Sequence, residues 1–335
     1  MCMYFTKGIK QDGYIMCLNC MKNKDMHPIF YYIYNITTQC DDILLLIQEY
    51  IKVDNYNNIA GGRDHTVALL QDNTVKCWGD NTNGKCKPPD SIQGKVISVS
   101  SRFSHSFALL NDNTVMCWGN KYNDVPDSIQ GKVVSISCGS DSCFALLYDG
   151  TVKCWGRGFY KGNKIPDSIQ GRVLSIECGD THTIALLNDM TVKCWGNNYH
   201  KQRDVPESVQ GSVVSINCGY YHSVALLNDN TVKCWGYNDW KQCDVPDSIQ
   251  GRVMSIDCGE YFSCALLNNN SVICWGNNMW RQCKPPDSIQ GKVVSINCGA
   301  QHSIALLNDG TVKCWGLNTN GQCDVPEGLK IMRKN

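Results

Sequence analysis

The chain has 335 residues, enough for one large repeat domain and a small additional segment, and 43% of them are hydrophobic, as in an ordinary globular protein. Lys plus Arg and Asp plus Glu both number 31, so no net charge draws the whole molecule to nucleic acid or to anionic lipid. No stretch approaches about 18 consecutive apolar residues, and the N-terminus has no apolar run typical of a signal peptide. We therefore expect an intracellular protein, cytoplasmic or alternatively nuclear, that does not bind membranes.

Residues 1–55 precede the first repeat and form a predicted N-terminal appendage. Four candidate zinc ligands lie in it: Cys17, Cys20, His27 and Cys40. They contain one Cys-x-x-Cys motif, whereas structural zinc sites usually need a second one, so we expect free thiols and neither a metal nor another cofactor. Residues 41–52 have acids at their start and a lysine at their end, which matches the helix dipole and predicts one amphipathic helix.

The triplet Cys-Trp-Gly then recurs seven times. Its tryptophans, which we expect to be structural, are Trp78, Trp118, Trp155, Trp195, Trp235, Trp275 and Trp315. The steps between copies are 40 residues except one of 37, so the repeats cover residues 56–330 and leave 331–335 as a tail. Such a fixed period predicts a repeat architecture.

The last unit contains three predicted strands, at residues 293–298, 303–307 and 311–315. Asp309-Gly310 before the third strand predicts a two-residue hairpin turn with positive φ at both positions. An Ala-Leu-Leu triplet lies nine residues before the cysteine of every Cys-Trp-Gly. The hairpin between the second and third strands therefore has a constant length.

These strands are apolar on both faces, which suits sheets sandwiched between neighbouring sheets. The prediction is an all-β, seven-bladed β-propeller, in which each Trp adds roughly 150–250 Å² of contact between blades. A solenoid is the alternative, but it needs polar capping repeats, which neither end provides. The proline of segments such as 244–246 suits an outer edge strand on the following blade, and residues 324–330 would then close the ring.

Most of the 22 cysteines recur at fixed repeat positions, including the seven of Cys-Trp-Gly. Buried cysteine packs as a small hydrophobe, so we expect mostly reduced thiols and not a disulfide scaffold. Five histidines also share one repeat position: His65, His105, His182, His222 and His302. Since each belongs to a different blade, they are too far apart to share a metal ion at the ~2 Å ligand distance of zinc, and a structural hydrogen bond is expected.

The repeat pattern is carried in the last unit by Gly299, His302, residues 305–310, 314–318 and 321–326. It resembles the regulator of chromosome condensation repeat superfamily. Repeats this short are similar to those of beta-lactamase inhibitor protein II and of large DNA viruses of amoebae. The resemblance implies a propeller fold and protein partners. The other propeller built from repeats of about forty residues is the Trp-Asp type, named for a recurring Trp-Asp dipeptide. It fits poorly, because this chain contains no Trp-Asp dipeptide.

The repeats diverge most at one predicted end of the blades, in the first turn of each unit and in the loop after Cys-Trp-Gly. The residues expected there to bind a partner are Tyr160, Tyr199, Tyr220, Tyr221, Trp240, Tyr261, Trp280 and Arg281. Tyr, Trp and Arg dominate interface hot spots, whereas catalysis would need a polar constellation that the repeats lack. The sequence thus predicts a non-catalytic scaffold that binds another protein. The alternatives are a guanine-nucleotide exchange factor for a small GTPase, as the family name implies, and a proteinaceous enzyme inhibitor.

Overall fold

The structure is a computed structural model, and it describes residues 58–331 apart from 120–124, 141 and 157–163. The chain divides into two units, Met1–Tyr50 and Ile51–Asn335, and every described residue belongs to the second. The helix predicted at 41–52 and the Cys-x-x-Cys motif lie outside the described residues.

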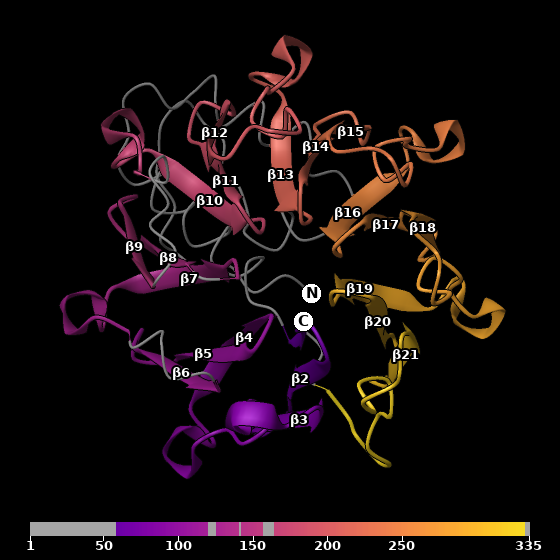
Figure 1. Cartoon of the computed structure of the whole chain (residues 1–335). Coiled ribbons are helices and arrows are strands. Elements are labelled where there is room, and N and C mark those ends of the chain that lie inside the picture. The colour runs from indigo at the N-terminus through magenta and orange to yellow at the C-terminus, as the bar shows by residue number, and fades with distance from the viewer. Residues whose placement is uncertain (1–57, 120–124, 141, 157–163, 332–335) are drawn as a thin grey trace, which may run out of the picture. The chain divides into compact units, whose positions relative to one another are not determined.

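Seven three-stranded antiparallel sheets stand around a ring, and each sheet is one repeat (Figure 1). We call them blades 1 to 7 in chain order. The inner strands are β1 (Ile59–Gly61), β4 (Val96–Arg102), β7 (Val133–Cys138), β10 (Val173–Cys178), β13 (Val213–Cys218), β16 (Val253–Cys258) and β19 (Val293–Cys298). The middle strands are β2 (His65–Leu69), β5 (His105–Leu110), β8 (Ser142–Leu147), β11 (His182–Leu187), β14 (His222–Leu227), β17 (Phe262–Leu267) and β20 (His302–Leu307). The outer strands are β3 (Val75–Gly79), β6 (Val115–Gly119), β9 (Val152–Gly156), β12 (Val192–Gly196), β15 (Val232–Gly236), β18 (Val272–Gly276) and β21 (Val312–Gly316).

Short 3-10 helices lie between the blades, and the described residues include no α-helix. The 3-10 helices are η1 (Thr82–Gly84), η2 (Asp90–Ile92), η3 (Asp127–Ile129), η4 (Asp167–Ile169), η5 (Glu207–Val209), η6 (Asp247–Ile249) and η7 (Asp287–Ile289). Within the described ranges no helix is long and apolar enough to span a membrane.

Each middle strand is buried on both faces, as the sequence predicts. In β17, Cys264 and Leu266 pack with Trp315 of blade 7, whereas Ala265 and Leu267 pack on the opposite face against blade 5. Successive side chains of a strand point to opposite faces, so a continuous apolar strand fills two interfaces at once. This alternation explains why Ala-Leu-Leu occurs in every unit.

The tryptophans of Cys-Trp-Gly are buried, with 4–8% of their surface exposed, and they tie neighbouring blades together. The Trp275 indole donates to the carbonyl of Gln242, in the loop of the preceding blade, at 2.9 Å. Ser263 donates to the same carbonyl at 3.1 Å. A buried indole N–H needs such a partner, and the same bond to a loop carbonyl of the preceding blade recurs at Trp78, Trp118, Trp235 and Trp315.

The segments after these loops do not form the edge strands that the sequence predicts. After blade 5, η6 places Ile249 in the core between blades 5 and 6. The Gln250 side chain then accepts from Val232 N at 2.8 Å and donates to Val232 O at 3.1 Å. A side-chain amide therefore pairs with the outer strand of its own blade and replaces a fourth strand at this edge.

The ring closes between blades 7 and 1, where the first and last sheets lie side by side (Figure 1). The Gln322 carbonyl accepts from Trp78 Nε1 at 3.0 Å and from Thr66 Oγ1 at 2.9 Å. Ile331 is fully buried in the interface between these blades and pairs with Leu70. The C-terminal segment thus closes the ring, although through a loop carbonyl and one isolated bridge and not through a strand.

The hairpin turns differ from the two-residue turns expected from Asp-Gly. In blade 7 the Gly310 amide bonds to Leu307 O at 2.9 Å, and Gly310 has φ of 82°. Asp309 is not among the residues with positive φ. A three-residue loop has this form, a turn followed by one left-handed residue, so each hairpin needs a single residue of positive φ.

Most of the described cysteines are free, and those of the inner strands are buried. Cys264 of β17 lies directly opposite Cys274 of β18, and these two form a disulfide. The expectation of packed thiols therefore has one exception in blade 6.

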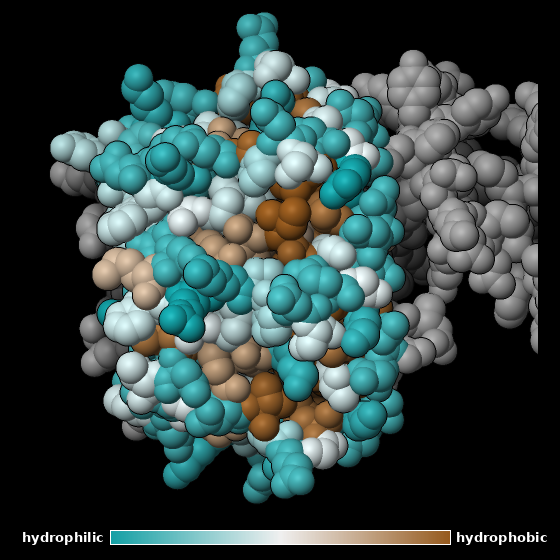
Figure 2. Space-filling view, turned by 90° about the vertical axis from the view of Figure 1, so that its right-hand side faces the viewer, coloured by the Kyte–Doolittle hydropathy of each residue, from teal (hydrophilic) through white to brown (hydrophobic). Residues whose placement is uncertain are grey.

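The side of the ring formed by blades 6 and 7 is mostly hydrophilic, with apolar atoms in small separate spots (Figure 2). Elsewhere in blades 6 and 7, Met254 and Val294 of the inner strands are 56% and 45% exposed. Scattered single residues of this kind are normal on protein surfaces, so this side view offers no obvious binding patch.

Candidate protein-binding site

The first turn of each blade and the loop after its outer strand lie at one end of the ring, which we call the loop face. His200, in the loop of blade 4, contacts the ring of Tyr221 in the first turn of blade 5, with centroids 5.1 Å apart. Tyr237, after β15, likewise contacts Tyr261 in the first turn of blade 6 at 5.8 Å. The turns between middle and outer strands form the opposite, hairpin end, as strand parity requires.

Backbone hydrogen bonds connect the first turns from blade to blade around the mouth of the central channel. The Tyr220 amide donates to Glu260 O at 2.9 Å, and the Glu260 amide donates to Ala300 O at 2.9 Å. The Ala300 amide continues to Gly62 O at 3.0 Å, across the ring closure. Because the backbone of each turn is held by the next, the side chains on these turns stand on a rigid base.

Seven rings form a continuous aromatic cluster on the loop face: Phe103, Tyr199, His200, Tyr220, Tyr221, Tyr237 and Tyr261. Tyr220 and Tyr261 stack with centroids 5.6 Å apart. Phe103, from blade 2, meets Tyr220, from blade 5, edge to face at 5.6 Å. The cluster therefore runs from the outer loops to the channel mouth and crosses it.

Four tyrosines of the cluster, Tyr220, Tyr221, Tyr237 and Tyr261, have raised pKa values and are held protonated. Burial, followed by the charges of Asp180 and Glu260, raises the pKa of Tyr220. Burial, together with Tyr221 and Glu260, raises the pKa of Tyr261 to about 12. At neutral pH these phenols are hydrogen-bond donors with apolar faces, which suits binding to a protein surface.

The predicted partner-binding residues separate into two groups. Tyr199, Tyr220, Tyr221 and Tyr261 belong to the aromatic cluster. The side chains of Trp240 and Trp280 do not enter the ring contacts among the described residues, and they are 43% and 45% exposed. Arg281 follows Trp280 and is exposed as well. Tyr160 lies outside the described residues.

Three consecutive blades carry basic residues where the backbone of this loop is left-handed. The φ values are 61° at Lys201, 62° at Lys241 and 63° at Arg281. Blades 1 and 7 have Gly84 and Gly321 at the same repeat position, with φ of 76° and 75°. A side chain in this conformation costs roughly 1–2 kcal/mol, and such strain often accumulates at functional sites.

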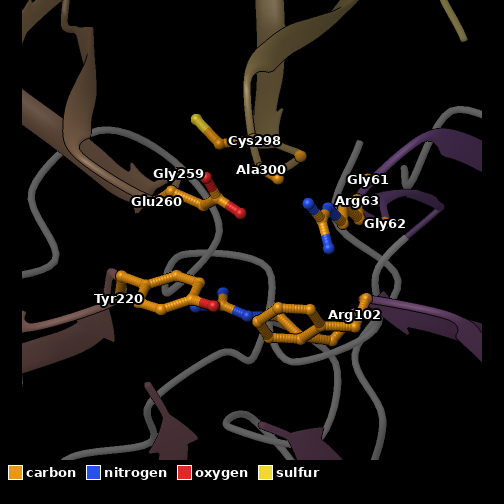
Figure 3. A pocket seen from close by; sticks show the side chains of 11 residues that line it. Gly61, Gly62, Arg63, Arg102, Tyr220, Gly259, Glu260, Cys298 and Ala300 are labelled. Carbon is orange, nitrogen blue, oxygen red and sulfur yellow. The ribbon is translucent and has the colours of Figure 1, made fainter. Parts of the chain in front are cut away.

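A small pocket lies at the channel mouth, beside the cluster. Figure 3 shows Glu260 and Arg63 pointing toward one another across it, with Tyr220 and Arg102 along one side. Arg102 occupies the repeat position that is glycine in the other six blades. Its guanidinium reaches from blade 2 to blade 5 and approaches the Cys218 carbonyl at 3.4 and 3.5 Å.

Behind the mouth, the central channel encloses about 250 Å³ and is lined by polar inner-strand residues, including Ser135, Ser175 and Ser215. Burial raises the pKa of Glu177 to about 7, although Ser137 donates to its carboxylate at 3.0 Å. Burial likewise raises the pKa of Asp257 to about 6.

Asp257 has a structural role in this channel. It accepts the amides of Cys258 at 2.9 Å and Cys298 at 2.8 Å, as well as the Asn217 side chain at 2.7 Å. Its carboxylate thus joins blade 6 to both neighbouring blades.

The repeat histidines hold blades together. His182, His222 and His302 each share a hydrogen bond of 2.8–3.0 Å between Nε2 and a hydroxyl of the following blade. Burial lowers the pKa of His182 and His222 to about 3 and that of His302 to about 4. No group of three or more His, Cys, Asp or Glu in the described part of the chain could hold a metal ion.

Comparison with known proteins agrees with this geometry. Seven segments match the family described as Regulator of chromosome condensation (RCC1) repeat: residues 57–85, 96–124, 133–161, 173–202, 213–239, 253–278 and 293–322. The chain belongs to this family. The finer likeness to beta-lactamase inhibitor protein II and to viral repeat proteins stays a prediction, and no curated protein matches the chain.

Several solved structures resemble this RCC1-repeat protein. The CRINKLY WD40 ectodomain of the Arabidopsis thaliana receptor kinase ACR4 is 20% identical, with a TM-score of 0.66 over 82% of this chain and 99% of that one. The ectodomain of Physcomitrella patens receptor kinase CR4 is 22% identical, with a TM-score of 0.64 over 78% and 73%. Human WBSCR16 is 20% identical, with a TM-score of 0.57 over 74% and 85%. At these identities the likeness shows the fold alone.

The sequence did not single out Phe103, His200 and Tyr237 as members of the site. A signal for the last two was present, because His200 stands where Trp240 and Trp280 stand in the next blades, and Tyr237 where blade 6 has Asn277. Phe103 also carried a signal, as an aromatic residue in a first turn where the repeats diverge, but its contact with Tyr220 crosses the ring and could not be predicted.

Proposed function

We propose that this RCC1-repeat protein is a non-catalytic scaffold that captures another protein on its loop face. The observation that carries the proposal is the aromatic cluster, whose seven rings come from blades 2, 4, 5 and 6. A row of aromatic rings on a backbone already tied together supplies contact area at a small cost in conformational entropy.

The titratable groups support binding over proton-transfer chemistry. Burial keeps four repeat histidines, His65, His182, His222 and His302, neutral, and it raises the pKa of the Tyr220 and Tyr221 phenols above the usual range. A general acid or base works best with a pKa near the operating pH and within reach of a substrate. Glu177 has such a pKa, about 7, but it lines the channel behind the mouth, away from the aromatic cluster.

Trp240 and Trp280 extend the proposed surface beside the cluster. Both are nearly half exposed, although large apolar side chains usually avoid water, and Tyr199 is 86% exposed. Exposed tryptophans next to an arginine are typical of interface hot spots. The partner is expected to be a protein inside the cell, in keeping with the sequence analysis, and nucleic acid is not expected because the formal net charge is zero.

The test is capture of a partner from cell lysate on the immobilised full chain, followed by mass spectrometry and by affinity measurement with the isolated partner. Changing Trp240 and Trp280 together to alanine should weaken binding by about 2–4 kcal/mol, as for a hot spot, with an unchanged melting temperature. Tyr148→Ala is the matched control, because Tyr148 is 46% exposed but lies at the hairpin end.

Unchanged affinity in the folded double variant would remove this surface from the proposal. The identity of the prey decides between the scaffold and its alternatives. A small GTPase as the only prey, with faster nucleotide release in the complex, would establish an exchange factor. A single enzyme that loses activity on binding would establish an inhibitor.

A further inference from the structure

Four blades pair the cysteine of Cys-Trp-Gly with a second cysteine nine residues later, in the loop of the loop face. The pairs are Cys77 and Cys86, Cys234 and Cys243, Cys274 and Cys283, and Cys314 and Cys323. Blade 4 has Arg203 at the second position, so its Cys194 has no such neighbour in the sequence. The spacing therefore recurs in some blades and is absent from others of the same fold, which provides an internal comparison.

In blade 5 the two sulfur atoms are in direct contact. Cys234 Sγ, on outer strand β15, and Cys243 Sγ, in the loop, are 2.6 Å apart, which is closer than two unbonded sulfurs usually approach. Cys243 Sγ also donates to Tyr237 O at 3.5 Å, and Cys234 Sγ to Gln242 O at 3.5 Å. The remaining movement to a covalent S–S bond of about 2.05 Å is small.

We infer that Cys234 and Cys243 form a reversible disulfide that ties the loop carrying Trp240 to outer strand β15. The loop of residues 237–244 is otherwise held by hydrogen bonds, among them Cys243 N to Asn238 Oδ1 at 2.7 Å. A covalent bond at Cys243 fixes the loop at its C-terminal end, three residues after the Trp240 side chain.

The oxidant required is a small-molecule disulfide such as glutathione disulfide. The Cys243 thiolate attacks one sulfur of this disulfide and releases one glutathione thiolate, leaving a mixed disulfide on Cys243. Cys234 then gives up its proton and attacks Cys243 Sγ, which releases the second glutathione. Two protein thiols are oxidised and one glutathione disulfide is reduced to two thiols, so electrons and protons balance.

The burial of the two cysteines sets this order of attack. Both residues are partly exposed, but burial of its sulfur raises the pKa of Cys234 well above the usual range. A thiol with a raised pKa stays protonated and reacts slowly with a dissolved oxidant, so Cys243 is the entry point.

Blades 4 and 6 show what distinguishes blade 5. In blade 6, Cys274 occupies the position of Cys234, but it is already bonded to Cys264 of the adjacent strand. Blade 5 has Val224 in place of Cys264, so no cysteine lies opposite Cys234 on the adjacent strand β14. In blade 4 the Arg203 guanidinium donates to Gly196 O at 3.2 Å, so a hydrogen bond holds the corresponding loop.

The test uses the full chain in buffers with graded ratios of reduced to oxidised glutathione, quenched with acid, alkylated and digested with trypsin without reduction. Cleavage after Lys233, Lys241 and Arg252 separates the two cysteines into peptides 234–241 and 242–252. A disulfide joins these peptides in mass spectrometry. Peptide 194–201, with Cys194 at the same repeat position, is the control in the same digest.

The expected result is that the joined peptide becomes the main form in oxidised buffers and disappears in reduced ones, while Cys194 stays alkylated throughout. The variant Cys243→Arg, which copies blade 4, should fold and leave Cys234 alkylated in every buffer. The inference is overturned if Cys234 and Cys243 are alkylated at all ratios, or if Cys243 stops at the mixed disulfide. Either outcome is independent of whether the loop face binds a partner.

Discussion

The two ends of the ring differ in how far the seven repeats diverge from one another, and the hairpin end is nearly uniform. In six hairpins an aspartate accepts both the amide and the hydroxyl of a threonine two residues later, with amide distances of 2.9–3.1 Å. The loop face instead carries His200, Trp240, Trp280 and Asn320 at one repeat position. The comparison shows that the fold tolerates large changes at one end of every blade.

The backbone of these loops explains the tolerance. The amides of His200, Trp240, Trp280 and Asn320 all donate to the side chain of a buried glutamine two residues later, at 2.9–3.1 Å. The same glutamines accept the next blade's tryptophan through their own carbonyls in blades 5 to 7 and across the ring closure. The glutamine side chain fixes the path of the backbone. The residue two positions before it takes part through its amide only, so its side chain can differ from blade to blade.

The largest expected effect is on the pH dependence of the free energy of unfolding. We expect this dependence to come from buried histidines and carboxyls and not from the exposed aspartates of the hairpins. Burial lowers the pKa of His65, His182 and His222 to about 3 and that of His302 to about 4. Stability from such histidines is complete above the unfolded pKa of about 6.5 and is lost as pH falls. The raised pKa values of Glu177 and Asp257 act in the opposite direction, because the folded state then binds protons first.

With four histidines against two carboxyls, the unfolded state binds about two more protons than the folded state between roughly pH 6 and 4.5. The free energy of unfolding should therefore fall by about 3 kcal/mol per pH unit in this window, as measured by urea titration. His222→Gln should reduce the slope by about 1.4 kcal/mol per pH unit, because it removes one of the four. An unchanged slope in this variant would contradict the assignment to the histidines.

A smaller effect is expected from adding one methyl group at either end of the ring. At Gly219, in the first turn of blade 5, a Cβ would lie 2.0 Å from the His222 ring and 2.8 Å from Gly259 O. Gly219→Ala should therefore lower the free energy of unfolding by about 3 kcal/mol, because the neighbours are buried.

The control at the hairpin end is Gly211, whose amide bonds to Met190 O at 3.0 Å. It has φ of +79° and no atom within 4 Å of an added Cβ. Gly211→Ala should lower the free energy of unfolding by only about 1 kcal/mol, from the left-handed backbone. Equal losses in the two variants would show that packing at the loop face is no tighter than at the hairpins.

The smallest effect concerns two strained residues, one at each end. Met190 in the blade 4 hairpin has φ of 59°, and Lys241 on the loop face has φ of 62°. Replacing either by glycine should raise the free energy of unfolding by about 0.5 kcal/mol, since relief of strain exceeds the added entropy of the unfolded chain.

The two variants should differ in their affinity for the partner. Met190→Gly should leave partner affinity unchanged, whereas Lys241→Gly should reduce it, because Lys241 adjoins Trp240 on the proposed surface. Equal affinities would indicate that the strain at Lys241 has no part in recognition. Surface plasmon resonance with the captured partner and chemical denaturation supply the two measurements.

Much of the fold follows from the sequence, because each repeat specifies one blade through residues that are close together in the chain. The seven Cys-Trp-Gly triplets count the blades, and the constant distance from Ala-Leu-Leu to cysteine sets the pairing of Ala305 with Lys313. The type of hairpin turn and the structure at the outer edge of each blade could not be predicted from the sequence. Asp309-Gly310 fits more than one hairpin type, and the role of Gln250 at the strand edge depends on how far its side chain reaches.

The candidate site, like the fold, was predictable from the sequence only in part. Departure from the repeat was enough to place Tyr220, Tyr221 and Tyr261 at one end of the ring, since strand parity is a property of the chain. Only the tertiary structure brought Phe103 to Tyr220 and Arg102 to Cys218, and set Cys243 against Cys234. The first two contacts cross the channel, and their distances depend on how seven blades share one closed ring. The third depends on the path of a loop held by Gln242. A repeat period contains neither the diameter of the ring nor the orientation of a side chain within a loop, because both result from packing of all the blades together.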